Sequence, residues 1–176
     1  SLATIIDQRW QSADKKIITG LVGGGMNGVD TLIALVKLQH AGWQSHAVFL
    51  DPAEQLDWVM RDINDAGCEV LFIEEAHRRV TEVLKESPFV LDGILGTGFK
   101  PPMRETLAEK MKFLAERCSK KTIIAVDCPS GVDCSTGLVS PNTMKATMTV
   151  CMEAVKVGLV KFPAFEYVGD LVCADV

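Results

Sequence analysis

Short hydrophobic segments rich in β-branched residues alternate with longer amphipathic segments along most of this chain. The short segments predict β-strands, and the longer ones, with apolar residues three or four positions apart, predict helices. The predicted strands span residues 16–23, 45–50, 68–74, 89–96 and 121–131, and the predicted helices span residues 28–43, 52–67, 76–87 and 102–119. Two further strand-like segments, 145–154 and 167–176, follow with no full-length helical pattern between them.

Strands that alternate with helices predict a Rossmann-like α/β fold, in which helices cover both faces of a mostly parallel sheet. The pattern shows no repeat and no linker, so residues 1–176 are expected to form one domain. Ligands of such folds bind at the carboxyl ends of the strands. The turns that follow the predicted strands are therefore where functional residues are expected.

Composition narrows the classes of protein that fit. The formal net charge is −5 and no basic stripe is present, which argues against nucleic-acid binding. No apolar run approaches the roughly 18 residues that span a bilayer. The N-terminus shows no signal-peptide pattern, but residue 1 is Ser, so a trimmed N-terminus is also compatible with the sequence. The six cysteines form no C-x-x-C pair. They are expected to be reduced core thiols of a cytoplasmic protein rather than zinc ligands.

The turn after the first predicted strand contains Gly23, Gly25 and Gly28 in the pattern G-x-G-x-x-G. Such glycines let the backbone approach a phosphate at the N-terminus of the next helix. Asp51, at the end of the second predicted strand, stands where NAD-binding dehydrogenases hold the ribose with an acid. The spacing leaves three interpretations of this turn open. It binds a redox dinucleotide, or it binds another phosphate-bearing ligand with a metal ion, or it is only a tight turn.

The fourth and fifth predicted strands also end in polar residues. Asp92 lies in an apolar strand end, where it needs a cation or several N–H donors, unless it caps the next turn. Asp127 ends the most hydrophobic strand, where it could serve as a general acid or base or bind a hydroxyl. Asn27, Asp92 and Ser130 offer hard oxygen ligands with little formal charge, which favours a monovalent cation. Residues 133–137 are expected to shape a turn.

Several motifs occur together in a fixed order. They are "GGGMNGVDT" at 23–31, "DGILGTGFKPP" at 92–102, "DCPSGVDCSTG" at 127–137, "KVGL" at 156–159 and "VGDLVCADV" at 168–176. In these motifs the chain resembles the NAD(P)H-hydrate epimerase family, also called the YjeF N-terminal domain. The resemblance extends from about residue 16 to residue 176.

The resemblance implies a three-layer α/β/α sandwich, a homodimer, and an isomerase that interconverts the R and S epimers of hydrated NADH and NADPH (NADHX and NADPHX). A partner NAD(P)H-hydrate dehydratase, which uses ADP or ATP and is often fused to the epimerase, then restores the cofactor. The resemblance also implies one K⁺ per subunit, held by Asn27, Asp92 and Ser130, and Asp127 as catalytic acid or base. The implied substrate-binding residues are Met26, Asn27, Gly28, Val29, Asp30, Gly96, Thr97, Gly98, Phe99, Lys100, Pro101, Pro102 and Asp127.

Three residues of the first motif depart from the family pattern. Met26 replaces an Asn, and Val29 and Thr31 each replace a Gly. Val29 is expected to conflict with a positive φ and to add bulk beside a phosphate, since a β-branched residue tolerates neither. These changes keep open a degenerate nucleotide-binding or scaffold domain. A conventional NAD-dependent enzyme that uses Asp51 is a third hypothesis. The short segment before the first strand predicts an excised or shortened domain without the family's N-terminal helices.

Overall fold

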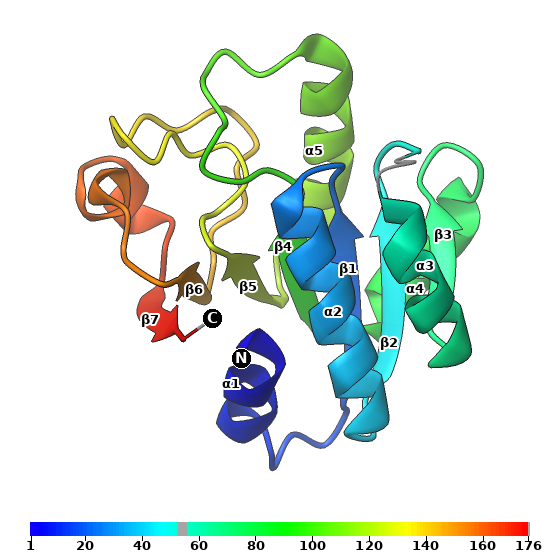
Figure 1. The fold of residues 1–176 in the computed structure, drawn as a ribbon. Helices are drawn as coiled ribbons and strands as arrows, with labels where there is room; N and C mark the ends of the chain where they lie inside the picture. The colour runs from blue at the N-terminus through cyan, green and yellow to red at the C-terminus, as the bar shows by residue number, and fades with distance from the viewer. Residues whose placement is uncertain (53–55, 176) are drawn as a thin grey trace.

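The computed structural model describes residues 1–52 and 56–175 and contains a seven-stranded sheet (Figure 1). The strands are β1 (Ile17–Val22), β2 (Gln44–Phe49), β3 (Glu69–Phe72), β4 (Phe89–Gly93), β5 (Thr122–Val126), β6 (Met148–Met152) and β7 (Asp170–Ala174). Their order is β3-β2-β1-β4-β5-β6-β7, and every neighbouring pair is parallel. The predicted Rossmann-like fold is confirmed.

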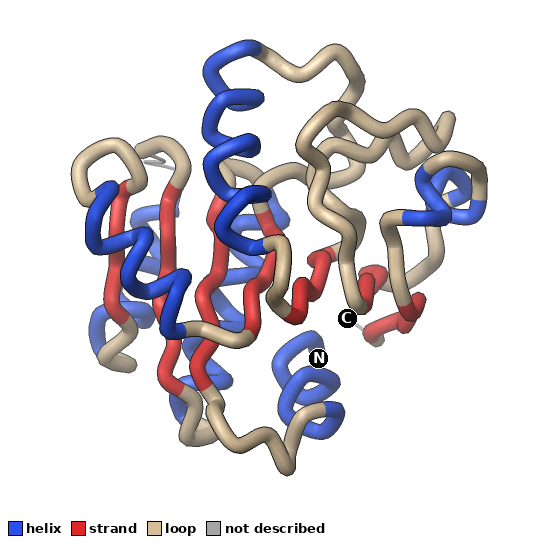
Figure 2. The backbone as a smooth tube through the Cα atoms, turned by 180° about the vertical axis from the view of Figure 1, so that it is seen from behind, coloured by secondary structure: helices blue, strands red, loops and turns tan. Residues whose placement is uncertain are grey.

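Five α-helices are described: α1 (Leu2–Arg9), α2 (Met26–His40), α3 (Asp57–Asp65), α4 (His77–Glu86) and α5 (Glu105–Cys118). Helices α2 and α3 lie in front of the sheet in Figure 1, and α4 and α5 lie in front of it in the reverse view of Figure 2. The four predicted helices are present, although residues 53–55 of the second predicted helix lie outside the described residues. The N-terminal helix α1 was not predicted.

One hydrophobic cluster lies on each face of the sheet, between the sheet and the helices that cover it. In β1, Ile18 and Val22 belong to the cluster under α1, α2 and α3, whereas Leu21 belongs to the cluster under α4 and α5. Successive side chains of a strand point to opposite faces, so a strand covered on both faces must be apolar at nearly every position. This explains the continuous apolar runs of the predicted strands. Helix α1 joins the first cluster through Leu2 and Ile6.

The connection from β5 to β6 differs from the others because it contains no helix. Residues 127–147 form turns, and the 3₁₀ helices η2 (Val157–Val160) and η3 (Ala164–Glu166) follow β6. A third cluster of buried residues supports this region: Cys128, Val132, Cys134, Cys151, Leu159, Ala164 and Val168. The loops that follow β5 and β6 therefore rest on a small core of their own.

The cysteines are all free thiols, and five of the six are buried, as the sequence predicted. Burial raises the pKa of Cys68 and of Cys151 to about 11. Among the described residues, no helix is both long and apolar enough to cross a membrane.

Candidate active site

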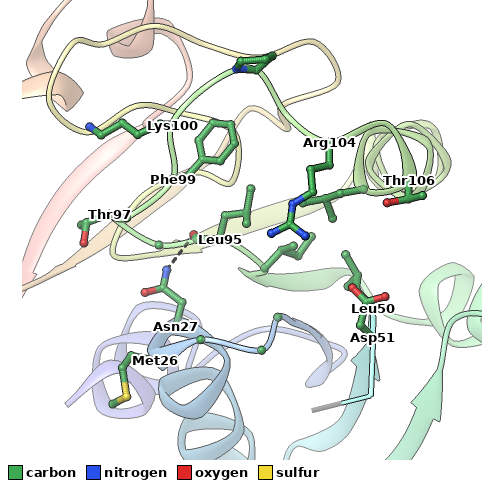
Figure 3. A pocket seen from close by; sticks show the side chains of 18 residues that line it. Met26, Asn27, Leu50, Asp51, Leu95, Thr97, Phe99, Lys100, Arg104 and Thr106 are labelled. Carbon is green, nitrogen blue, oxygen red and sulfur yellow. Dashed lines mark hydrogen bonds between the residues drawn. The ribbon is translucent and has the colours of Figure 1, made fainter. Parts of the chain in front are cut away.

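A cavity of about 750 Å³ opens where β1 and β4 lie side by side and the chain leaves them in opposite directions across the sheet (Figure 3). Such a reversal of strand order is the usual ligand site of open α/β sheets. Its walls are Gly23–Asn27, Ile94–Lys100, Pro102, Leu50, Asp51, Arg104, Thr106 and Leu107. The turns after β1, β2 and β4 thus meet at one cavity, as their position at strand ends predicted.

The glycines of the first turn serve two different purposes. A Cβ atom on Gly23 would lie 1.8 Å from the carbonyl oxygen of Ile94, and one on Gly28 would lie 1.9 Å from the carbonyl oxygen of Gly23. A Cβ atom on Gly25 would meet nothing within 4 Å. The first and third glycines are therefore required by backbone packing, and only the second faces open space at the cavity. The three-glycine spacing alone says little about the ligand.

The expected conflict at Val29 is wrong. Val29 lies inside α2 with no positive φ, and its side chain is buried in the first hydrophobic cluster. Thr31 is also buried, and its hydroxyl donates a hydrogen bond to the carbonyl of Asn27 at 2.7 Å. A Cβ atom on Gly93 would lie 1.8 Å from the same hydroxyl, so Thr31 fills the space beside β4. Both departures from the family pattern are accommodated by helix packing.

Asn27 joins the ends of three strands. Its amide nitrogen donates to the carbonyl of Leu95 at 3.0 Å, the bond drawn in Figure 3, and to the carbonyl of Val126 at 2.6 Å. Its amide oxygen is directed at Gly96, where an added Cβ atom would lie 2.7 Å away. The side chain is largely buried yet lines the cavity. Asn27 therefore fixes the turn after β1 against the loops that follow β4 and β5.

Asp92 and Ser130 form a buried pair beside this network. The hydroxyl and the backbone N–H of Ser130 both donate to the Asp92 carboxylate, the N–H at 2.8 Å. The N–H of Leu95 donates to the Ser130 hydroxyl oxygen at 2.9 Å. Burial raises the pKa of Asp92, and the hydrogen bonds from Ser130 oppose that shift. Asp92 has no Lys or Arg partner in the described part of the chain, so its charge lacks a cation.

The donors around this pair suit a hard monovalent cation. One carboxylate, one hydroxyl, one amide oxygen and nearby backbone carbonyls provide oxygen ligands with a single negative charge. No group of three or more His, Cys, Asp or Glu side chains that could hold a metal ion occurs among the described residues. An uncompensated buried carboxylate is stabilised by a cation. The residues that the family resemblance implies for K⁺ therefore fit a monovalent cation in their chemistry.

Asp127 adopts a strained conformation at the end of β5. Its φ is 67°, and the N–H of Cys128 donates to the carbonyl of Val126 at 2.8 Å, which closes a tight turn around it. A non-glycine residue in such a turn costs about 1–3 kcal/mol and persists where its surroundings hold it. Here the N–H of Met152 donates to Asp127 Oδ1 at 2.8 Å, and the ammonium of Lys156 also contacts this atom. The carboxylate is therefore held in one orientation.

Lys156 is a functional candidate that the sequence did not identify. Its Nζ contacts Asp127 Oδ1 and donates to the carbonyl of Met152 at 2.8 Å. The other carboxylate oxygen of Asp127, Oδ2, makes no hydrogen bond within the described residues, so it can accept a proton from a ligand. The motif that contains Lys156 was visible in the sequence, but its pairing depends on β6 lying beside β5.

Asp30 lies one turn into α2, and both burial and the charge of Asp127 raise the pKa of its carboxyl. The loop after β4 is fixed by Lys100, which donates to Asp133 at 2.8 Å and to Ser135 at 2.9 Å. Asp133 also accepts the backbone N–H of Ser135 at 2.8 Å, which confirms its predicted turn-shaping role. The bond from Lys100 and these N–H groups lower the pKa of Asp133.

The structure brings most, but not all, of the predicted substrate residues to the cavity. Met26, Asn27, Gly96–Lys100 and Pro102 line it, and Met26 as a residue is 71% exposed. Gly28, Val29, Asp30, Pro101 and Asp127 are not among its lining residues. Asp127 directly follows Val126, whose carbonyl accepts a bond from Asn27, and is thus next to the cavity wall rather than in it. Arg104 lines the cavity and was not predicted.

Comparison with known proteins places this arrangement in a family context. The model of the family described as YjeF-related protein N-terminus matches residues 1–158. An NAD(P)H-hydrate epimerase of Rhodopirellula baltica is 31% identical over 159 residues, which cover 86% of this chain and 62% of that protein. The bifunctional NAD(P)H-hydrate repair enzyme Nnr of Mycobacterium leprae is 31% identical over 159 residues, covering 90% of this chain and 30% of that enzyme.

The chain thus spans less than two thirds of the length of these two relatives. The crystal structure of the yeast protein YNL200c has the same fold, with a TM-score of 0.82 at 22% identity, and the match covers 98% of this chain and 73% of that one.

Proposed function

Because the chain belongs to the family of YjeF-related protein N-termini, we propose that it is an NAD(P)H-hydrate epimerase domain that interconverts the R and S epimers of NADHX and NADPHX. The observation that carries this proposal is the convergence of Asn27, Asp92 and Ser130 from three strand ends, with Asp127 held beside them by Lys156. The relatives named above as epimerase or repair enzyme support the choice of reaction.

In this proposal Asp127 and Lys156 move a proton to and from the hydroxyl on C6 of the hydrated nicotinamide ring. The Lys156 ammonium donates a proton as the C6–O bond breaks, so the oxygen leaves as water with the bonding electrons. Water then adds to the opposite face of C6, and its proton passes back to Lys156 through Asp127 Oδ2, which has no bond to any described residue. The glycine turn and the N-terminus of α2 hold the phosphates.

We propose that K⁺ binds among Asn27, Asp92 and Ser130, which supplies the missing counter-charge of Asp92 and offsets the charge of the substrate phosphates. We further propose a cytoplasmic homodimer that delivers the S epimer to an NAD(P)H-hydrate dehydratase. Relatives named as bifunctional repair enzymes support fusion to, or cooperation with, that second enzyme.

The proposal is tested by supplying R-NADHX with an S-specific dehydratase and following the recovery of NADH. Asp127→Asn and Lys156→Met are each expected to lower kcat at least 100-fold, since both remove a proton-transfer group. Asp65→Asn, at the exposed end of α3, is the matched control and should retain full activity. If the wild type is no faster than spontaneous epimerisation, the chain is instead a nucleotide-binding or scaffold domain of this fold.

A further inference from the structure

The charged side chains that line the cavity are those of Asp51, Lys100 and Arg104. Two of them have a partner in the structure. Lys100 is bound to Asp133 and Ser135, and Asp51 accepts a bond from Lys110 at 2.6 Å. The guanidinium of Arg104 makes neither a hydrogen bond nor an ion pair with any residue that the structure describes, and only its backbone carbonyl is bonded, by the N–H of Ala108 at 2.9 Å. The guanidinium of Arg104 is therefore the charged group of the lining that has no partner among the described residues.

The position of Arg104 directs that charge into the cavity. Arg104 is the residue before α5, and its guanidinium extends into the space between Leu95 and Asp51 (Figure 3). It stands at the N-terminus of a 14-residue helix whose first turn has no side-chain cap. The first N–H groups of a helix have no intrahelical partner and add positive potential, which the carboxylate of Glu105 in the same turn partly offsets. Thr106, in the same turn, offers a hydroxyl to the cavity.

We propose that Arg104 binds a phosphate group of the hydrated dinucleotide, an inference that rests on the function proposed above. A guanidinium presents two parallel N–H donors that match two phosphate oxygens, and a free one in a cavity is suited to that role. Two phosphates of the substrate could be bound there: the pyrophosphate, which NADHX and NADPHX share, and the 2′-phosphate, which only NADPHX carries.

The neighbourhood of Arg104 is consistent with the adenosine half of the ligand. Leu50, Leu95 and Leu107 line this part of the cavity and provide apolar surface. Asp51 follows β2, the strand whose end binds the adenosine ribose in dinucleotide-binding folds. Lys110 pairs with Asp51 at 2.6 Å and with Glu74 at 2.8 Å, and it also donates to the carbonyl of Leu50 at 2.7 Å, so the carboxylate of Asp51 already has a cationic partner. Arg104 is thus left to attract an anion.

The test measures binding of the intact dinucleotides NAD⁺ and NADP⁺ by calorimetry, which needs no turnover. Arg104→Ala should weaken binding of one or both by roughly 10- to 100-fold, the usual effect of losing a charge-assisted hydrogen bond. Arg104→Lys should recover part of the loss, since it keeps the charge without the paired donors. Lys112→Ala, an exposed cation on the same helix, is the control and should bind like the wild type.

The pattern of losses identifies the phosphate. Equal weakening of both dinucleotides by Arg104→Ala assigns the pyrophosphate, and weakening of NADP⁺ alone assigns the 2′-phosphate. Unchanged affinity for both, or no binding of either by the wild type, overturns the proposal. Since the guanidinium of Arg104 makes no bond with the described residues, its removal should leave the melting temperature unchanged.

The outcome is separable from that of the proposed function. An epimerase whose KM values are unaffected by Arg104→Ala would refute the role of Arg104 and leave the reaction intact. A wild type that binds NADP⁺ through Arg104 without epimerising NADPHX would refute the reaction and leave the phosphate contact intact.

Discussion

The two roles assigned to the glycines of the first turn can be separated by adding one methyl group at each of two positions. Gly23→Ala would place a Cβ atom 1.8 Å from the carbonyl oxygen of Ile94, whereas real Cβ contacts are essentially never below 3.0 Å. The obstacle is backbone, so β1 and β4 must move apart. That movement also strains the hydrogen bond of 3.2 Å from the N–H of Gly23 to the carbonyl of Gly93.

The magnitude follows from three terms. Overpacking costs about 1–3 kcal/mol, and a weakened backbone hydrogen bond costs about 1 kcal/mol. Replacing Gly restricts the unfolded chain and returns roughly 0.4–1 kcal/mol. Gly23→Ala should therefore lower the free energy of unfolding by about 2–3 kcal/mol. In a chain of this length that corresponds to a decrease in melting temperature of roughly 5–10 °C.

Gly25→Ala is the matched control in the same turn. A Cβ atom there meets nothing within 4 Å, and the φ of −98° is open to alanine. Alanine is a poorer N-cap than glycine by a few tenths of a kcal/mol or more, a cost that the restricted unfolded chain about offsets. Calorimetric melting should show Gly25→Ala close to the wild type. If both variants melt together, the assignment of Gly23 to packing is wrong.

Two further outcomes are expected. KCl should raise the melting temperature of the wild type when it is compared with choline chloride at equal ionic strength, because K⁺ compensates the buried carboxylate of Asp92. It should not raise the melting temperature of Asp92→Asn. Equal shifts in both proteins would contradict a K⁺ site at Asp92. Burial is the largest influence on His46 and lowers its pKa below the ordinary 6.5, despite the opposing charge of Glu69. The unfolded chain therefore takes up a proton below pH 6.5 that the folded chain refuses, so stability falls as the pH drops from 6.5, by at most about 1.4 kcal/mol per pH unit. Melting between pH 7 and pH 5 should be less pH-dependent in His46→Gln, and equal slopes would exclude this histidine as the cause.

The fold was largely predictable because each of its rules is local. A strand covered on both faces must be apolar throughout, and the helices between such strands carry an apolar stripe, so the alternation of the two is visible in the sequence. Helix α1 was not predicted because it has few buried residues, which form no clear helical pattern in the sequence and pack into the cluster that also contains residues of α2. The connection after β5 was recognised as different, but its support by a third cluster was not, since that cluster collects residues distant in sequence.

The sequence allowed the polar residues near the strand ends to be named as site residues, but it did not reveal which of these side chains contact one another. Asn27, Asp92 and Ser130 could be named because each is a polar residue within an apolar strand end or a few residues after one. The contact between Lys156 and Asp127 could not, since it depends on two parallel strands that are joined by a long connection. The motif comparison misjudged Val29 because a family glycine does not establish a positive φ, and α2 begins early enough to include this residue.

The third cluster has a consequence for local stability. Asp127 and Ser130 begin the connection that rests on this cluster, whereas Asn27 belongs to α2 and the larger first cluster. Units with few buried apolar contacts open more often than the main core, and amide hydrogen exchange detects such openings. Asn27 on one side of the site, and Asp127 and Ser130 on the other, thus belong to parts of the molecule that are expected to open at different rates. A ligand that contacts both would slow exchange in residues 127–147 far more than in α2, so occupancy of the site could be followed by exchange alone.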